Sequence, residues 1–250
     1  MKKYFRAMLC TISQSLKERN QIFGRLIVFT VIIYLFCQIF ESINSSVERI
    51  WYVTMTEGLI LSTTTLVFQI VKDIQTNAVA YFLLRPVNYS LLRISEAIGI
   101  AILLYLVLMS WGILFLILLK GIFVASIFST ISSMLIGILS LFLYVQISML
   151  IGLLSFWVIE IKTLIYFHLT AAFCFGGLII PITYYPPLMQ KICFCTPYPW
   201  ILWWPGSVFS GILVNHFIAF AGWLGWSIFF GFLNVLVFER YKKALVMNGG

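Results

Sequence analysis

Residues 94–119 read ISEAIGIAILLYLVLMSWGILFLILL, and after Glu96 this stretch contains no charged side chain. The hydrocarbon core of a bilayer is about 30 Å thick, so a helix needs roughly 20 apolar residues to cross it. We therefore expect residues 94–119 to form a membrane-spanning helix.

Five more apolar stretches flank this segment along the chain. Together they predict six spans over residues 22–43, 50–71, 94–119, 134–159, 164–182 and 217–238. The 250 residues are 62% hydrophobic and 10% charged, a composition that excludes an ordinary soluble domain. The expected fold is an all-α integral membrane protein that forms a single domain over residues 1–250, with no room for a separate soluble catalytic domain.

The basic residues are distributed unevenly along this arrangement. If the N-terminus lies inside, 13 of the 16 Lys and Arg residues fall on inner segments, and only Arg49, Lys120 and Lys191 fall outside. The positive-inside rule then places both termini in the cytoplasm. The net charge of +8 is explained by topology, and no nucleic-acid partner is expected.

The segments outside the spans have patterns of their own. In residues 1–20 an apolar stripe at helical spacing (Phe5, Met8, Leu9, Ile12 and Leu16) predicts an interfacial helix lying flat on the inner membrane surface. The alternative is a solvated basic tail. Residues 72–89 are too polar to insert at their start and too apolar in their middle for a plain loop. They predict a short amphipathic cytoplasmic helix that ends before Pro86.

The stretch from 183 to 215 is apolar but interrupted by proline. It carries Trp200, Trp203 and Trp204, and tryptophan favours the level of the lipid head groups. We expect two short re-entrant helices on the outer face. The last span at 217–238 is followed by a cytoplasmic tail at 239–250.

Two stretches carry a resemblance to a known family. They are DIQTNAVAYFLLRPVNY at residues 73–89 and the tail ERYKKALVMNGG at 239–250. With the order of the segments, they resemble the permease subunits of type-2 ABC exporters, in the branch of daunorubicin-resistance-like and uncharacterised export permeases. Asn77 stands where that family has glycine, and asparagine also tolerates left-handed backbone conformations.

The resemblance implies a bacterial inner-membrane permease that exports its substrate. It would work with a second permease copy or paralogue and with a separate ABC ATPase subunit. No phosphate-binding G-x-x-x-x-G-K-[ST] loop occurs in the chain, so ATP would be used by the partner and no cofactor would be bound directly. The expected ATPase contacts on the coupling helix are Asp73, Ile74, Asn77, Tyr81, Leu84, Arg85 and Pro86.

The second predicted span is the most polar, because it holds Glu57, the run Ser62–Thr65 and Gln69. Hydroxyl groups suit close helix packing, so this span is expected inside the bundle. Glu57, Thr64 and Gln69 are candidates for a translocation path. Glu57 would then bind a cationic substrate or a proton; alternatively it reaches the outer interface or pairs with a polar neighbour.

An enzyme is not expected. The chain has no H-E-x-x-H motif, its two histidines, His168 and His216, are far apart in sequence, and its five cysteines are scattered. No metal site is predicted, and Glu96 and Glu160 are expected to be surface charges. A secondary transporter or a channel that does not use ATP is the alternative function.

Overall fold

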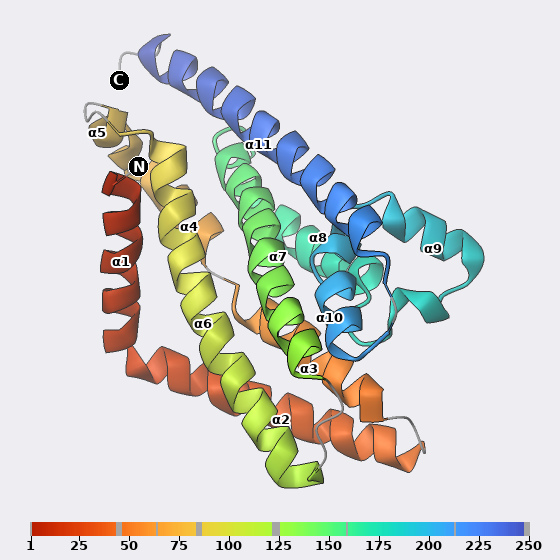
Figure 1. Ribbon diagram of the computed structural model, residues 1–250. Helices are drawn as coiled ribbons and strands as arrows, with labels where there is room; N and C mark the ends of the chain where they lie inside the picture. Colours follow the sequence, from red (N-terminus) through yellow and green to blue (C-terminus); the bar gives the residue numbers. More distant parts are fainter. Residues whose placement is uncertain are drawn as a thin grey trace.

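The computed structural model describes residues 2–43, 47–63, 65–83, 87–121, 126–158, 160–212 and 214–247. Within these ranges the regular structure is helical throughout. The long helix α7 (Ile127–Leu154) lies between α6 (Tyr89–Lys120) and α11 (His216–Met247), while α2 (Arg19–Ser42) runs across the lower part of the view in Figure 1.

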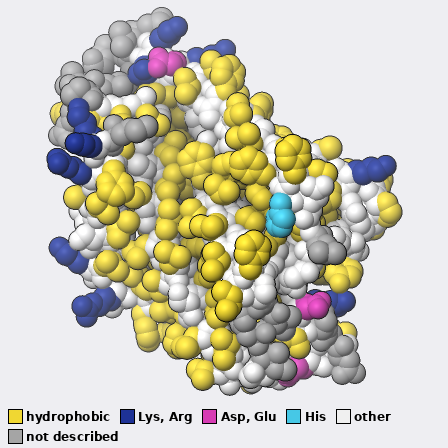
Figure 2. All heavy atoms as spheres, viewed as in Figure 1, with side chains coloured by type: hydrophobic (Ala, Val, Ile, Leu, Met, Phe, Trp, Pro, Cys, Tyr) yellow, Lys and Arg dark blue, Asp and Glu magenta, His cyan; other side chains and the backbone are white. Residues whose placement is uncertain are grey.

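Among the described residues, five segments are long and apolar enough to cross a membrane. They are Arg19–Ser42, Val47–Gln75, Tyr89–Lys120, Ile127–Leu154 and His216–Lys243, which match the first, second, third, fourth and sixth predicted spans. Their outer faces remain apolar, and Figure 2 shows hydrophobic side chains over most of one face with Lys and Arg towards its edges. By length and hydropathy the chain is a candidate multi-pass membrane protein.

The fifth predicted span differs from the structure. Helix α8 (Ile161–Gly176) has 16 residues, or about 24 Å at 1.5 Å per residue, which is shorter than the hydrocarbon core. It ends because Gly177 adopts a left-handed conformation with φ 67°, the usual glycine signal that terminates a helix. The prediction that this helix continues to residue 182 was therefore wrong.

The N-terminal helix α1 (Lys2–Lys17) packs along the first half of α6. The backbone N–H of Asn88 donates to the Tyr4 hydroxyl at 3.0 Å, and Met8 fits against Gly99 further along α6. The two helices thus run in the same direction, and α2 turns away after Glu18 (Figure 1).

This packing divides the apolar stripe that the sequence predicts on α1. Met8 and Ile12 contact α6, whereas Phe5, Leu9 and Leu16 are exposed. Because α6 is itself a candidate span, α1 follows the direction of a span. The predicted position of α1 on the inner membrane surface stays a prediction.

The segment before α11 contains the short helices η1 (Ile182–Tyr184), α9 (Pro187–Phe194), η2 (Tyr198–Trp200) and α10 (Trp203–Phe209). Ser140 of α7 donates a hydrogen bond to the Trp200 carbonyl at 3.1 Å, and Ser129 donates to the Val208 carbonyl. This segment therefore follows α7 over about 11 residues, or roughly 16 Å. Helix α10 is buried along its whole length and packs against α3 and α7.

The tryptophans of this segment are buried inside the helix bundle. Trp200, Trp203 and Trp204 are all buried, and Trp204 is only 2% exposed. They fill the space between helices, since the large aromatic side chains pack against α7, α3 and Phe194. Their level relative to the lipid head groups stays a prediction.

Candidate functional site

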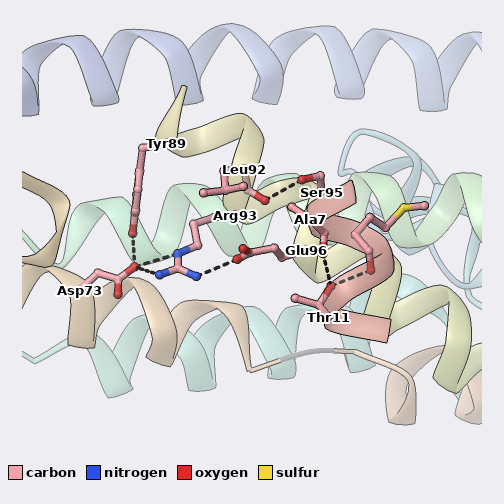
Figure 3. A network of polar contacts seen from close by, with 9 residues as sticks. Ala7, Thr11, Asp73, Tyr89, Leu92, Arg93, Ser95 and Glu96 are labelled. Atoms are coloured by element: carbon pink, nitrogen blue, oxygen red, sulfur yellow. Dashed lines mark hydrogen bonds and ion pairs between the residues drawn. The ribbon is translucent and has the colours of Figure 1, made fainter. Parts of the chain in front are cut away.

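A network of charged and aromatic side chains joins α4 (Leu66–Gln75) to the start of α6 (Figure 3). Arg93 donates from Nε to Asp73 Oδ2 at 2.8 Å and from Nη2 to the same oxygen at 2.7 Å. The Tyr89 hydroxyl donates to that oxygen at 2.7 Å. On its other side Arg93 pairs with Glu96 at 2.7 Å. Charge-assisted bonds of this kind are the stronger ones.

The same network reaches two further helices through aromatic contacts. The Arg93 guanidinium lies 5.1 Å from the ring of Phe82 in α5 (Ala78–Leu83). The Tyr89 ring stacks on Phe238 of α11, with centroids 5.6 Å apart and planes at 19°. Side-chain contacts thus link α4, α5, α6 and α11 at this network.

Helix α5 is set at an angle to α4 by Asn77. Its φ of 53° is the only positive φ of a non-glycine residue in the described part of the chain, and asparagine is tolerant of that region. On α5, Val79 is fully buried, whereas Tyr81 is 71% exposed. The short helix therefore packs against the protein through Val79 and exposes the side chain of Tyr81.

The structure separates the predicted coupling residues into two groups. Asp73 and Ile74 pack inward, Asp73 within the network and Ile74 against a buried cluster, while Asn77 and Tyr81 are exposed. The other three predicted contacts lie outside the described residues: Leu84, Arg85 and Pro86.

Sequence analysis missed most of this network. Glu96 is only 17% exposed and is paired with Arg93, so the expectation of a surface charge was wrong. The signal was present, because Arg93 and Glu96 stand three residues apart on one helix face. Asp73 could not be added in this way, since it comes from another helix.

The second predicted span is broken in its middle. Helix α3 (Val47–Leu61) stops, Ser62 and Thr63 leave the helix, and α4 begins at Leu66. The Ser62 and Thr63 hydroxyls bond to the backbone carbonyls three residues earlier, each at 2.7 Å. Such local bonds compete with the helix. The prediction that this hydroxyl run continues the helix was therefore wrong.

Arg25 of α2 satisfies the carbonyls exposed by the break. Its Nη1 donates to the Leu61 carbonyl and to the Thr63 carbonyl, the latter at 2.9 Å. Non-helical backbone at membrane depth is tolerated where it is buried in protein or lines a cavity. At this position Ser62 is buried, and Thr63 and Thr65 line a cavity.

Two cavities meet at the break. The first, which we name the break cavity, has a volume of about 310 Å³ and mostly apolar walls from α3, α4, α7 and α8. The second, the polar cavity, has about 320 Å³ and lies between α1, α2, α4 and α6. Arg25 and Thr65 line both cavities.

The candidates for a translocation path have different positions. Gln69 lines the polar cavity. Glu57 is 8% exposed and lines neither cavity, and no hydrogen bond or ion pair to its carboxylate is present in the described part of the chain. Thr64 lies outside the described residues.

No family model matches the chain, and no curated protein is significantly similar to it. The resemblance to type-2 ABC export permeases therefore depends on the residues quoted from the sequence and stays a prediction.

Proposed function

We propose that this chain is the membrane-spanning permease subunit of an ATP-driven transporter, most simply an exporter. The observation that carries the proposal is the connection from α5, whose Tyr81 is exposed, through Arg93 and Tyr89 to α6 and α11. A partner that pushed on α5 would move two long candidate spans at once. ATP hydrolysis belongs to that partner in this scheme, and two permease chains would form the path.

In the proposed topology α8 is a sixth span and both termini lie in the cytoplasm. The N-terminal ends of α1 and α6 and the C-terminal end of α11 then carry the inner charges, including Arg6, Arg93 and Arg240. Because α8 is short, η1 and α9 would complete its passage to the outer side, with α10 as the re-entrant helix.

The proposed mechanism uses the contacts that link α5 to α6 and α11. Closure of the ATPase on ATP displaces α5 and the preceding α4; the contact of Phe82 with Arg93 and the ion pair of Asp73 with Arg93 carry the displacement to α6. Packed helices shift between discrete arrangements rather than deforming continuously. The bundle would thus alternate between inward-open and outward-open states.

The test is purification of the tagged chain in mild detergent, with mass spectrometry of its partners and an ATPase assay. We expect a stoichiometric ATPase with a Walker A motif. Tyr81→Ala, which removes the most outward-facing aromatic ring of α5, should weaken its recovery at least fivefold. Tyr184→Ala is the matched control, since Tyr184 is 60% exposed on η1. Recovery of the chain without an ATPase under several gentle conditions would overturn the proposal.

One observation favours the alternative of a secondary transporter. Many such transporters bind substrate at helices interrupted near the membrane centre, and the break between α3 and α4 is of that kind. The two functions differ in their energy source. Substrate movement in vesicles that continues without ATP but stops when the ion gradient is abolished would favour this alternative.

A further inference from the structure

Arg25 caps the carbonyls at the end of α3, and it also has the hydrogen-bond donors to bind a ligand. Only its Nη1 is used by the carbonyls of Leu61 and Thr63, and a guanidinium has five N–H donors in all. No acidic side chain forms an ion pair with it within the described ranges. Glu18 is an acidic residue that lines the polar cavity together with Arg25, but it does not line the break cavity.

The break cavity supplies hydrogen-bonding groups and no carboxylate among the residues that line it. Tyr144 and Ser148 of α7 and His168 of α8 line it beside the apolar walls. His168 is 3% exposed; its Nδ1 lies 3.1 Å from the Tyr198 hydroxyl, and its Nε2 has no hydrogen-bond partner in the described part of the chain. A buried polar atom without a hydrogen-bond partner is rare in proteins, and this one belongs to a residue that lines the cavity.

The rim of the break cavity faces the outer apolar surface. Phe68 of α4 and Leu169 of α8 line the cavity and are 54% and 39% exposed. A molecule dissolved in the bilayer can therefore approach from the side. Arg25 supplies the cationic group of this cavity, and with Thr65 it also lines the polar cavity.

We propose that the break cavity binds an anionic amphiphile, with its carboxylate or phosphate head group at Arg25 and its hydrocarbon part against the apolar walls. A charge inside a membrane protein is retained where it has a partner or a ligand, and charge-assisted bonds to guanidinium are strong. The volume of about 310 Å³ is at the lower end of the range of roughly 300–1,000 Å³ for ligand pockets. One hydrocarbon chain suits it better than a bulky ligand.

The test is binding of tritiated palmitate to the purified chain in phosphatidylcholine nanodiscs, by scintillation proximity. We expect saturable binding, and binding of the neutral analogue hexadecanol at least tenfold weaker. Arg25→Gln should weaken palmitate binding at least tenfold, whereas Arg25→Lys should stay within threefold. Arg19→Gln is the matched control, because Arg19 is exposed one and a half turns earlier on the same helix.

A second variant keeps the proposal testable if Arg25→Gln does not fold, since Arg25 also caps the break. Ile165→Trp fills the cavity and leaves the charge in place, and it should also weaken binding at least tenfold. Palmitate binding no higher than in empty nanodiscs, or equal binding of hexadecanol, would overturn the proposal. So would wild-type affinity in either folded variant.

A further binding experiment distinguishes a membrane lipid from a free single-chain amphiphile as the source of the anionic head group. Replacement of part of the phosphatidylcholine by phosphatidylglycerol lowers the apparent palmitate affinity if a membrane lipid occupies the site. An unchanged affinity assigns the site to free single-chain amphiphiles. If the chain binds no palmitate, the expected recovery of an ATPase with the purified chain is unaffected. The two proposals can therefore fail independently.

Discussion

At the scale of single residues, the junction of α4 and α6 depends on one carboxylate. Asp73 accepts hydrogen bonds from Tyr89 and from Arg93, and its side chain and that of Arg93 are 13% and 17% exposed. Loss of one partner from a buried pair leaves an uncompensated charge. Asp73 is therefore expected to matter for stability as well as for coupling.

Asp73→Asn should lower the free energy of unfolding by about 2 kcal/mol, between the values for exposed and fully buried pairs. For a chain of this size that corresponds to roughly 4–8 °C in the thermal midpoint, which circular dichroism in detergent would measure. Glu239→Gln is the control, because Glu239 is 54% exposed in its pair with Lys242, and its shift should stay within about 2 °C. Equal shifts in the two variants would contradict the buried role of Asp73.

At the scale of elements, sequence reasoning found the long helices but not all of their ends: α7 begins at Ile127 and not at 134, and α11 continues to Met247 and not to 238. The existence of α2, α6, α7 and α11 follows from uninterrupted apolar runs, so it was predictable. The break after Leu61 had a local signal in the hydroxyl run that follows it. Its cap was not predictable, since Arg25 precedes the carbonyl that it binds by 36 residues.

The contact between α4 and α7 is tight enough to be tested by size. A Cβ at Gly152 of α7 would lie 2.7–3.2 Å from side-chain atoms of Ile70 in α4. Gly152→Leu should therefore destabilise the chain by about 1–3 kcal/mol through overpacking. The added change Ile70→Ala should recover at least half of the loss in thermal midpoint.

The matched control for this pair is Gly225→Leu in α11, because a Cβ at Gly225 would meet nothing within 4 Å. It should leave the midpoint within about 2 °C of wild type. A destabilisation of the control as large as that of Gly152→Leu, or no recovery in the double variant, would show that α4 does not pack on α7 in this way.

At the scale of the whole molecule, the account depends on which end of the bundle faces the cytoplasm. Residue patterns predicted the number of long apolar segments closely, because hydrophobic length is a local property. The positions of α1 along α6 and of α10 against α7 were not predictable, because they arise from packing between distant segments. Orientation was inferred from charge alone, and α5 can meet an ATPase only if that inference holds.

Cysteine labelling in intact cells tests this orientation directly, in a background without the five native cysteines. Gln75→Cys places an exposed thiol at the end of α4, and Leu188→Cys places one on α9, where Leu188 is 71% exposed. We predict that a membrane-impermeant maleimide labels position 188 in intact cells and position 75 only after permeabilisation. Labelling of position 75 in intact cells would contradict the account, because α5 would then lie on the wrong side of the membrane for ATP-driven coupling.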